Sequence, residues 1–471
     1  MNKFEWIIEQ ICDTSESLVT DLTAVSGVEQ EQLLAFGTGP KAGIAYQCAH
    51  YAFEEIARNE PDLIAVEHED RSITYGELNK RAEQIACLLM DRGVQVGDYV
   101  GLVTTRSIEM ICGIFGILKA GGAYIPIDHE LPLERIQYML ELADCSTILY
   151  HTDIRQEALD CLDSSKTVSL VEATSHNHFT PPVIRGDSPA YVVFTSGSTG
   201  KPKGVIIKHS SCCNFISANP VMIDANGGDK IAQNAAIGFD VAIAEIFLAL
   251  SFKATLVLRE EKDYFSTLKK VNKAFITPTG LSKLDPKLFV NLKKVVLAGE
   301  NFNESLISKW THVQFINAYG PTETTLGSNA TPLNTSNIIT IGKPITNTNQ
   351  YIVDRNLQLV PIGVPGELVI GGAGVALGYL NRPDLTAEKF IHNHFLNNGS
   401  KMYRTGDICK WTEDGNIQIL GRSDDMVKVK GYRIELDEVS SAISRHPDVT
   451  GSAVIVKDDQ LIAFVTPDTV S

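Results

Sequence analysis

The first 150 residues alternate between helical and strand-like patterns of hydrophobic positions. After the capping-box sequence Thr74-Tyr75-Gly76-Glu77, apolar side chains share one helical face as far as Gly93, and Ser107 is placed to open a second helix. The patterns predict helices over 74–93, 108–120 and 133–143, and strands over 99–103, 123–126 and 147–150. Helices and strands that alternate with short loops indicate a doubly wound, largely parallel α/β sheet.

The chain keeps this α/β character after residue 190 and becomes β-rich near residue 339. Apolar β-formers at 191–194 and 205–207 predict a hairpin. The patterns over 234–256, 275–297 and 313–318 predict a second α/β half, and short β-like pieces over 339–420 predict a small β-rich subdomain. Beyond 425, a hairpin, a helix over 436–445 and two strands near Val454 and Ile462 are expected.

These patterns predict an α/β fold with a large N-terminal domain and a small C-terminal one. The large domain, residues 46–423, is expected to hold two doubly wound α/β subdomains and the β-rich subdomain. Residues 424–471 are expected to form part of a small α+β subdomain. Residues 1–45 are interpreted as a linker or lead-in rather than a core element, with a disordered tail as the alternative for the first 20 residues.

Composition and charge narrow the class of protein. The 471 residues are 44% hydrophobic and carry a formal net charge of −16, which argues against nucleic acid or an anionic membrane as the main partner, because both require basic surface. The nine cysteines show no CxxC or metal-like spacing, and no secretory signal is visible. The apolar stretch 241–252 is interrupted by Glu245 and is too short to span a bilayer. A soluble cytoplasmic protein with reduced thiols is therefore expected.

A loop rich in hydroxyl groups, glycine and lysine lies between the two strands of the expected hairpin. Its sequence is Thr195-Ser196-Gly197-Ser198-Thr199-Gly200-Lys201-Pro202-Lys203-Gly204. Glycines let backbone N–H groups converge on an anion, and Lys201, Lys203 and Lys208 add a local basic patch, so the loop is interpreted as a polyphosphate site. It is not a Walker loop, which needs Gly-Lys-Ser/Thr leading into a helix, and an ordinary surface turn is the alternative.

A second polar segment follows the apolar strand 313–316, at the end of a strand where open α/β sheets bind ligands. Asn317 can contact an amide-like base edge, and Tyr319 can stack on a base. Thr322 can bond a phosphate, and Glu323 can hold Mg²⁺ that bridges phosphates. The alternative is an ordinary Gly-Pro turn. Further along the chain, Asp407 offers a carboxylate after a turn, which suits the two hydroxyls of a ribose.

These motifs, taken in order, resemble the adenylate-forming enzymes, the superfamily of acyl-CoA synthetases, luciferases and the adenylation domains of nonribosomal peptide synthetases. The resemblance covers roughly residues 50–465. Its matched segments are 74–78, 118–128, the glycine-rich loop, 319–323, 366–380, Asp407 and 421–438. The sequences of 118–128 and 427–436 are most similar to the amino-acid-activating domains of nonribosomal peptide synthetases.

The resemblance implies that ATP activates an amino acid as aminoacyl-AMP with release of pyrophosphate. The acyl group would then pass to a phosphopantetheine thiol on a peptidyl carrier protein domain, and an upstream condensation domain is the second implied partner. The implied ATP-binding residues are Thr195, Ser196, Gly197, Ser198, Thr199, Gly200, Lys203, Asn317, Tyr319, Thr322, Asp407 and Arg422. Thr322 and Glu323 are the implied catalytic residues, Glu323 the Mg²⁺ ligand and Asp424 the hinge. Lys201 and Lys203 are expected to be mobile charges over the β- and γ-phosphates.

Asp240 is expected to select an amino acid as the substrate. A carboxylate that faces an apolar pocket is costly to bury unless a cation meets it, and the α-ammonium group of the substrate is such a cation. The alternative is a helix N-cap. The resemblance implies a side-chain pocket lined by Val241, Ala244, Thr279, Val296, Ala298, Ala318, Leu326 and Gly327. These small or aliphatic residues predict a bulky, mostly apolar side chain, either aromatic or a modified ornithine of the fungal siderophore type.

Two departures from the family pattern leave other functions open. Leu377 stands where the family often has arginine, which is expected to affect only a surface contact. The catalytic C-terminal lysine of the family is expected beyond Ser471, and without it adenylation would be slowed by orders of magnitude. An acyl- or aryl-CoA ligase of the same fold, and a non-catalytic module that binds nucleotide or amino acid, are therefore the alternatives.

Overall fold

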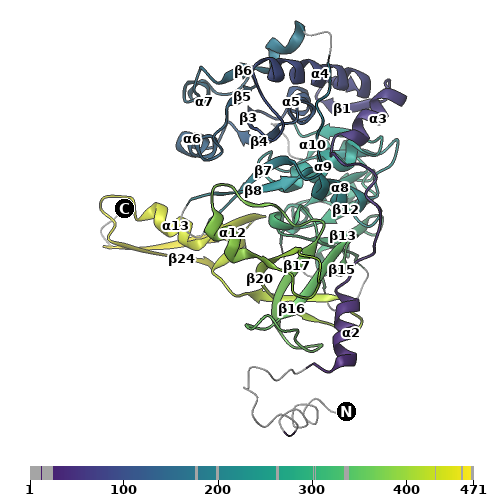
Figure 1. The fold of residues 1–471 in the computed structure, drawn as a ribbon, viewed down its shortest axis with the longest axis vertical. Coiled ribbons are helices and arrows are strands. Elements are labelled where there is room, and N and C mark those ends of the chain that lie inside the picture. The colour runs from purple at the N-terminus through teal and green to yellow at the C-terminus, as the bar shows by residue number, and fades with distance from the viewer. Residues whose placement is uncertain are drawn as a thin grey trace.

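The computed structural model describes residues 12, 25–175, 179–197, 201–260, 265–300, 302, 304–333, 339–429, 431–457 and 460–467. Figure 1 shows a large body and a smaller C-terminal lobe, in yellow, that projects from its side. Sheets of seven, nine and five strands build the large body, and two further β-hairpins follow in the chain. This architecture confirms the predicted α/β fold with a β-rich part and a small α+β lobe.

The seven-stranded sheet comes mainly from the first half of the chain. Its order is β18-β8-β7-β4-β3-β5-β6, with parallel pairs from β6 to β7 and antiparallel pairs from β7 to β18. Its strands are β3 (Tyr99–Thr104), β4 (Ala123–Asp128), β5 (Thr147–Tyr150), β6 (Thr167–Ser169), β7 (Pro189–Thr195), β8 (Lys203–Lys208) and β18 (Gly378–Tyr379). The antiparallel β7–β8 hairpin carries the glycine-rich loop, as predicted.

Two of the helices that cover this sheet, α4 (Tyr75–Asp91) and α5 (Ile108–Lys119), begin at the caps that the sequence predicts. The others are α6 (Leu133–Leu142) and α7 (Gln156–Asp160), followed by the 3₁₀ turn η2 (Leu170–Ser175). Thr74 and Glu77 form both bonds of the predicted capping box, and the Ser107 hydroxyl accepts the Met110 N–H at 3.0 Å. Every residue of α5 except Glu109 is buried, which explains its continuous apolar sequence.

The nine-stranded sheet combines the second α/β half with a hairpin from near the start of the chain. Its order is β15-β14-β13-β12-β11-β9-β10-β1-β2. Its strands are β1 (Ile64–His68), β2 (Arg71–Thr74), β9 (Lys230–Gln233), β10 (Thr255–Leu258), β11 (Lys273–Ile276), β12 (Lys294–Leu297), β13 (Gln314–Tyr319), β14 (Asn329–Pro332) and β15 (Lys343–Pro344). The parallel β1–β10 pair joins residues almost 200 positions apart, so the two α/β halves interleave.

Helices pack against the nine-stranded sheet and join it to the rest of the large body. They are α3 (Tyr51–Asn59), α8 (His209–Ser217), α9 (Asp240–Leu250), α10 (Ser266–Lys270) and α11 (Pro278–Ser282), with the 3₁₀ turns η3 (Pro286–Leu288), η4 (Glu304–Leu306) and η5 (Thr322–Thr324). One hydrophobic core contains buried side chains of both sheets, which include Leu102 of β3, Ile231 of β9 and Phe247 of α9. The two sheets therefore share one core.

The five-stranded sheet is the predicted β-rich part. It contains β16 (Thr348–Val353), β17 (Gly366–Gly372), β19 (Phe390–His392), β20 (Lys401–Trp411) and β21 (Ile417–Arg422), all paired antiparallel, and α12 (Pro383–Lys389) precedes β19. Helix α2 (Gly27–Phe36) lies in the expected lead-in, but Leu33 of this helix is buried in one cluster with Trp411. The view of the lead-in as separate from the core is therefore wrong from Val25 onwards, because its apolar side chains complete the core of this sheet.

The C-terminal lobe begins after β21. It contains the hairpin β22 (Met426–Val429) and β23 (Tyr432–Glu435), helix α13 (Leu436–Ile443), and the hairpin β24 (Gly451–Lys457) and β25 (Gln460–Thr466). These are the predicted elements. The first hairpin reaches the large body, where the Tyr432 and Phe239 rings meet edge to face with centroids 5.3 Å apart.

The described ranges can be searched for disulfide bonds and for membrane-spanning helices. No disulfide bond joins cysteines within them. No helix in the described part of the chain is both long enough and apolar enough to cross a membrane.

Candidate active site

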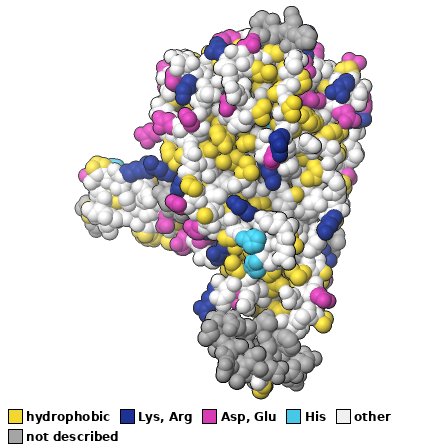
Figure 2. Space-filling view, viewed as in Figure 1, with side chains coloured by type: hydrophobic (Ala, Val, Ile, Leu, Met, Phe, Trp, Pro, Cys, Tyr) yellow, Lys and Arg dark blue, Asp and Glu magenta, His cyan; other side chains and the backbone are white. Residues whose placement is uncertain are grey.

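A cavity of about 1600 Å³ lies between the large body and the first C-terminal hairpin. The predicted residues that line it are Thr195, Ser196, Asp240, Val241, Ala244, Thr279, Ala298, Asn317, Ala318, Tyr319, Thr322, Leu326, Gly327, Asp407 and Arg422. Ser198, Thr199 and Gly200 lie outside the described residues. In Figure 2 the C-terminal lobe stands beside the large body, with Lys and Arg side chains along one edge. The fold thus brings residues from four distant parts of the sequence to one cavity.

The glycine-rich loop contacts the C-terminal hairpin. The Ser196 hydroxyl donates a hydrogen bond to the Arg433 carbonyl oxygen at 2.9 Å, and the Thr195 hydroxyl is buried without a hydrogen-bond partner among the described residues. The loop closes tightly at Gly197, because a Cβ atom there would lie 2.2 Å from the Lys201 carbonyl oxygen. A polar group at Thr195 is therefore available to a ligand.

Lys203 is a fixed internal charge rather than a mobile one. It is 7% exposed, and its Nζ lies 3.8 Å from Glu323 Oε1 and 5.1 Å from the centroid of the Tyr379 ring. Burial lowers the pKa of Lys203, and the Glu323 charge opposes that effect. The prediction of a mobile lysine is wrong at this position, because β8 directs the side chain inward. Lys201 is exposed, and its Nζ lies 5.5 Å from the Tyr138 ring centroid.

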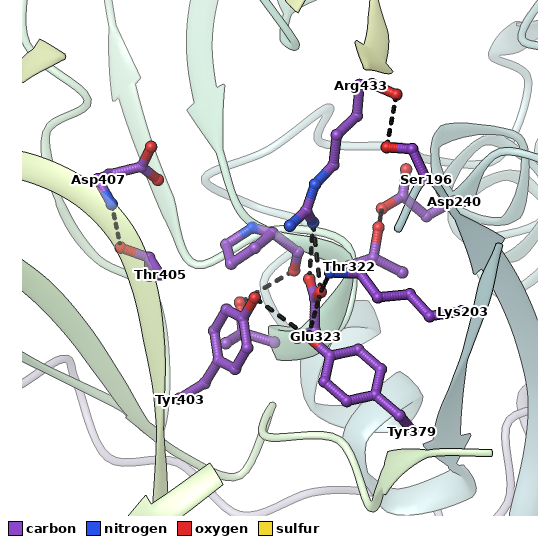
Figure 3. Close-up of polar contacts among 12 residues, drawn as sticks. Ser196, Lys203, Asp240, Thr322, Glu323, Tyr379, Tyr403, Thr405, Asp407 and Arg433 are labelled. Atoms are coloured by element: carbon purple, nitrogen blue, oxygen red, sulfur yellow. Dashed lines mark hydrogen bonds and ion pairs between the residues drawn. The ribbon is translucent and has the colours of Figure 1, made fainter. Parts of the chain in front are cut away.

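Glu323 lies at the centre of a buried network of charged and polar groups (Figure 3). Its side chain is fully buried in η5 and accepts hydrogen bonds from the Tyr379 hydroxyl at 2.7 Å and from Arg433 Nη1 at 3.0 Å. Burial acts to raise the pKa of Glu323, but the Arg433 and Lys203 charges and the Tyr379 hydroxyl lower it to about 2. Glu323 is therefore an ionised carboxylate held by three partners.

The loop that carries Glu323 has a constrained backbone. Thr325 and Leu326 adopt left-handed conformations, with φ of 61° and 71°. A Cβ atom on Gly320 would lie 2.6 Å from the Gly327 Cα, so glycine allows the loop to fold back on itself. The Thr325 hydroxyl donates to the Gly374 carbonyl oxygen at 2.6 Å. These contacts hold the loop in the shape that directs Thr322 and Glu323 inward.

Asp240 faces the cavity from the first turn of α9. The Thr322 hydroxyl donates to its Oδ2 at 2.6 Å, and burial raises the pKa of Asp240. The N-cap residue of α9 is Phe239, which forms no side-chain cap bond. The alternative of Asp240 as an N-cap is therefore wrong. Thr322, predicted to bond a phosphate, donates its hydroxyl hydrogen bond to Asp240 in this structure.

The predicted ribose residues form a second charged group. Arg422 Nη1 donates to Asp407 Oδ1 at 2.6 Å, and Arg422 Nε donates to Asp424 Oδ1 at 2.6 Å. The Tyr319 hydroxyl donates to the other Asp407 oxygen, Oδ2. The Asn317 side-chain nitrogen donates to the Thr340 carbonyl oxygen at 2.8 Å. Asp407, Arg422 and Asp424 are thus brought together, and the Tyr319 ring is left as the surface for stacking.

Three residues of this network carried no assigned role in the sequence interpretation. Arg433 pairs with Glu323, Tyr379 bonds the same carboxylate, and Lys428 Nζ lies 5.9 Å from the Tyr319 ring centroid. All three belong to segments of the family resemblance, and for Arg433 and Lys428 the available signal was one basic residue on each strand of the hairpin. Leu377 is 40% exposed, which agrees with the expected surface position.

Seven of the eight residues predicted for the side-chain pocket line the cavity, and their role in binding a substrate side chain stays a prediction. Val296 is fully buried in β12 and does not line the cavity, because it lies on the same strand face as Ala298 but deeper in the core. Phe275, Phe215 and Met222 line the cavity and were not predicted. A Cβ atom on Gly327 would lie 2.8 Å from Met222 Cε and 3.0 Å from Phe215 Cε2. These larger side chains reduce the room that the small residues leave.

The residues present fit a magnesium ion shared with phosphates. Mg²⁺ in phosphate sites is usually held by one or two carboxylates and by the phosphates themselves. The ionised Glu323 provides one carboxylate, and no group of three or more His, Cys, Asp or Glu side chains suited to a metal occurs within the described ranges. A site of this kind needs the phosphates of ATP to complete it.

Comparisons with known proteins give a matching family model and several relatives. The family model for AMP-binding enzymes matches residues 53–380. Tyrocidine synthase 1 of Brevibacillus parabrevis is 39% identical over 449 residues, which cover 92% of this chain and 40% of that protein. Bacitracin synthase 3 of Bacillus licheniformis is 38% identical over 474 residues, which cover 97% of this chain and 7% of that protein. The chain thus spans less than half the length of these relatives.

A solved structure agrees with the sequence comparisons. It is a nonribosomal peptide synthetase protein that contains adenylation and PCP domains, bound to a vinylsulfonamide inhibitor. The similarity has a TM-score of 0.82 and 25% sequence identity, and covers 92% of this chain and 78% of that one. The chain has the fold of this adenylation-domain structure.

Proposed function

Because the chain belongs to the family of AMP-binding enzymes, we propose that it activates the carboxylate of an amino acid with ATP for nonribosomal peptide synthesis. A carboxylate oxygen forms a bond to the α-phosphorus, and the bond from the α-phosphorus to the oxygen bridging to the β-phosphorus breaks. The products are aminoacyl-AMP and pyrophosphate. The observation that carries this proposal is the buried Asp240 in the wall of the cavity that also holds the proposed ATP residues.

Asp240 supports an amino acid rather than a plain acid as the substrate. Its carboxylate is buried and has a single side-chain donor, the neutral Thr322 hydroxyl. An ionised carboxylate in such a place is stabilised by a cation, which the α-ammonium group of an amino acid supplies. Thr322 then links the substrate end of the cavity to Glu323, the next residue. An aryl acid has no such cation, so an aryl-CoA ligase gains nothing from Asp240.

The other end of the cavity suits ATP. Asp407 can accept hydrogen bonds from the ribose hydroxyls, with Arg422 beside it, and Tyr319 offers a ring for the adenine. Glu323 would hold Mg²⁺, which when bound neutralises phosphate charge and favours departure of pyrophosphate. The protein itself contributes orientation and charge compensation at positions fixed before the reaction.

The first C-terminal hairpin forms one wall of the cavity, so we assign to the lobe a movement that opens the phosphate site. Arg433 of this hairpin forms an ion pair with Glu323, and the Ser196 hydroxyl of the phosphate loop donates to the Arg433 carbonyl oxygen. Asp424 lies between β21 and β22 and is the proposed hinge, held in this state by Arg422. Movement about Asp424 would free Glu323 for Mg·ATP and later return the hairpin for transfer of the acyl group.

The pocket supports a substrate with a bulky, mostly apolar side chain. Ala244, Ala298, Ala318 and Gly327 leave space, and the unpredicted Phe275 and Met222 add apolar surface. An aromatic amino acid fits this description, and so does an acylated hydroxyornithine of the fungal siderophore type. After activation, the acyl group would pass to the phosphopantetheine thiol of a peptidyl carrier protein domain, with a condensation domain upstream.

Pyrophosphate exchange with an amino acid panel tests the proposal. Asp240→Ala is expected to reduce exchange with the best amino acid by at least about a hundredfold, because it removes the partner of the ammonium group. Asp240→Asn keeps the size and the Thr322 contact but lacks the charge, and the exposed Asp414→Ala is the control. Unchanged exchange in Asp240→Ala would show that Asp240 does not bind the ammonium group, and would remove the observation that carries the proposal. Binding of ATP and amino acid without exchange, measured with the full-length protein that supplies the C-terminal lysine, would identify a non-catalytic module. Preference for glycine or aspartate would contradict the large pocket.

A further inference from the structure

The Tyr379 hydroxyl donates a hydrogen bond to Glu323 Oε1 at 2.7 Å. We propose that Tyr379 is a positioning residue whose hydroxyl holds the Glu323 carboxylate in one orientation while its cation changes between Arg433 and Mg²⁺. This inference rests on the proposed function, because it assumes that Glu323 holds the magnesium ion of Mg·ATP. It assigns a role to a residue of the segment 366–380 that carried none.

The Tyr379 side chain is held rigidly. It is 4% exposed, and its ring meets the Phe390 ring edge to face with centroids 5.4 Å apart. Its backbone N–H donates to the Thr386 hydroxyl at 2.9 Å. The preceding Gly378 has φ of 141°, and a Cβ atom there would lie 2.5 Å from Thr386 Cγ2, so only glycine allows this approach. A fixed ring presents its hydroxyl at a fixed point.

The three partners of Glu323 belong to different parts of the molecule. Lys203 and Tyr379 come from paired strands of the large body, β8 and β18, whereas Arg433 comes from the C-terminal hairpin (Figure 3). When the hairpin leaves, both hydrogen bonds from Arg433 to Glu323 are lost. The Lys203 Nζ is 3.8 Å from Glu323 Oε1, so the Tyr379 hydroxyl, at 2.7 Å from Oε1, keeps the remaining hydrogen bond among these three partners. Arg433 makes its shorter contact, 3.0 Å, with Oε2, so Oε2 becomes the oxygen exposed to an incoming cation.

The hydroxyl of Tyr379 is fixed in its role as a donor. Its single hydrogen is directed to Glu323 Oε1, which as a carboxylate oxygen can only accept. The Tyr403 hydroxyl lies 3.4 Å from the Tyr379 hydroxyl. Since Tyr379 uses its single hydroxyl hydrogen in the bond to Glu323, Tyr403 is the donor in the contact between the two tyrosines and helps to orient Tyr379.

The test compares binding of Mg·ATP with binding of metal-free AMP in Tyr379→Phe. Calorimetry is expected to show Mg·ATP binding about tenfold weaker than in the wild type, because a hydrogen bond to a charged group is lost, and AMP binding unchanged. Tyr403→Phe is expected to weaken Mg·ATP binding by a smaller factor, about two- to threefold.

The control is Tyr351→Phe, which removes a buried hydroxyl bonded to Asn393 in the five-stranded sheet and should leave both affinities unchanged. Equal losses for AMP and Mg·ATP in Tyr379→Phe would show a merely structural role and overturn the proposal. Unchanged Mg·ATP affinity in Tyr379→Phe and Tyr403→Phe would also overturn it, with the proposed function intact. A wild-type protein that binds Mg·ATP no better than AMP would remove the proposed function, and this inference with it.

Discussion

Arg433 is predicted to compete with Mg²⁺ for the Glu323 carboxylate. In Arg433→Met the side chain keeps most of its length but loses the two contacts of Nη1 with the carboxylate, at 3.0 and 3.3 Å. A hydrogen bond to a charged group contributes about 1.5–3 kcal/mol, and about 1.4 kcal/mol changes an equilibrium constant tenfold. Lys203 and Tyr379 continue to hold Glu323, so the lower end of this range applies.

The expected result is tighter binding of Mg·ATP by about tenfold, because the binding-competent fraction of the protein rises when the docked hairpin is weakened. Calorimetric titration with Mg·ATP measures this directly, and a parallel titration with metal-free AMP separates the phosphate site from the nucleoside site. Arg445→Met, an exposed residue of the same lobe, is the matched control. Unchanged or weaker Mg·ATP binding in Arg433→Met would refute the competition.

Two further predictions concern the core and the pocket. Burial lowers the pKa of His209 to about 4, so the unfolded chain takes up a proton near pH 6.5 while the folded chain does not, and stability falls as the pH decreases from 6.5 towards 4. His209→Asn keeps an acceptor for the Ala49 N–H and should remove about 3 kcal/mol of this loss, measured by denaturant unfolding at several pH values. Phe275→Ala should shift pyrophosphate exchange towards larger aromatic side chains, and Leu281→Ala, which is buried away from the cavity, should destabilise the protein without that shift.

Local signals in the sequence were sufficient for most elements. The capping box at Thr74, the cap at Ser107 and the apolar runs of β3 and β5 each determine an element from a few neighbouring residues, and the structure confirms them. The pairing of β1 with β10 could not be predicted in this way, because it depends on which sheet offers an uncovered edge. The burial of Leu33 in the β-rich core was missed because the residues that it packs against lie far along the chain.

The candidate site shows the same limit for charges. The glycine-rich loop could be identified from its residue types, and Asp407 from its match to a motif of the family; the fold brings both to one cavity. The partner of each charge could not be identified: Arg433 meets Glu323 across 110 positions, and Lys203 points inward because of its place in β8. Periodicity describes the face of an element, whereas an ion pair depends on how two elements meet.

These pairings change how ligand binding has to be understood. Asp407 is bonded by Arg422, Glu323 by Arg433, and Asp240 by Thr322, so each of these three acids already has a partner within the protein. A ligand group therefore replaces or adds to an existing contact, and only the difference between the two contributes to its affinity. Of the three partners, Arg433 alone lies on the hairpin beyond the proposed hinge, so its exchange is the one coupled to movement of the lobe. Glu323 is consequently where occupancy of the phosphate site and the position of the lobe are decided together.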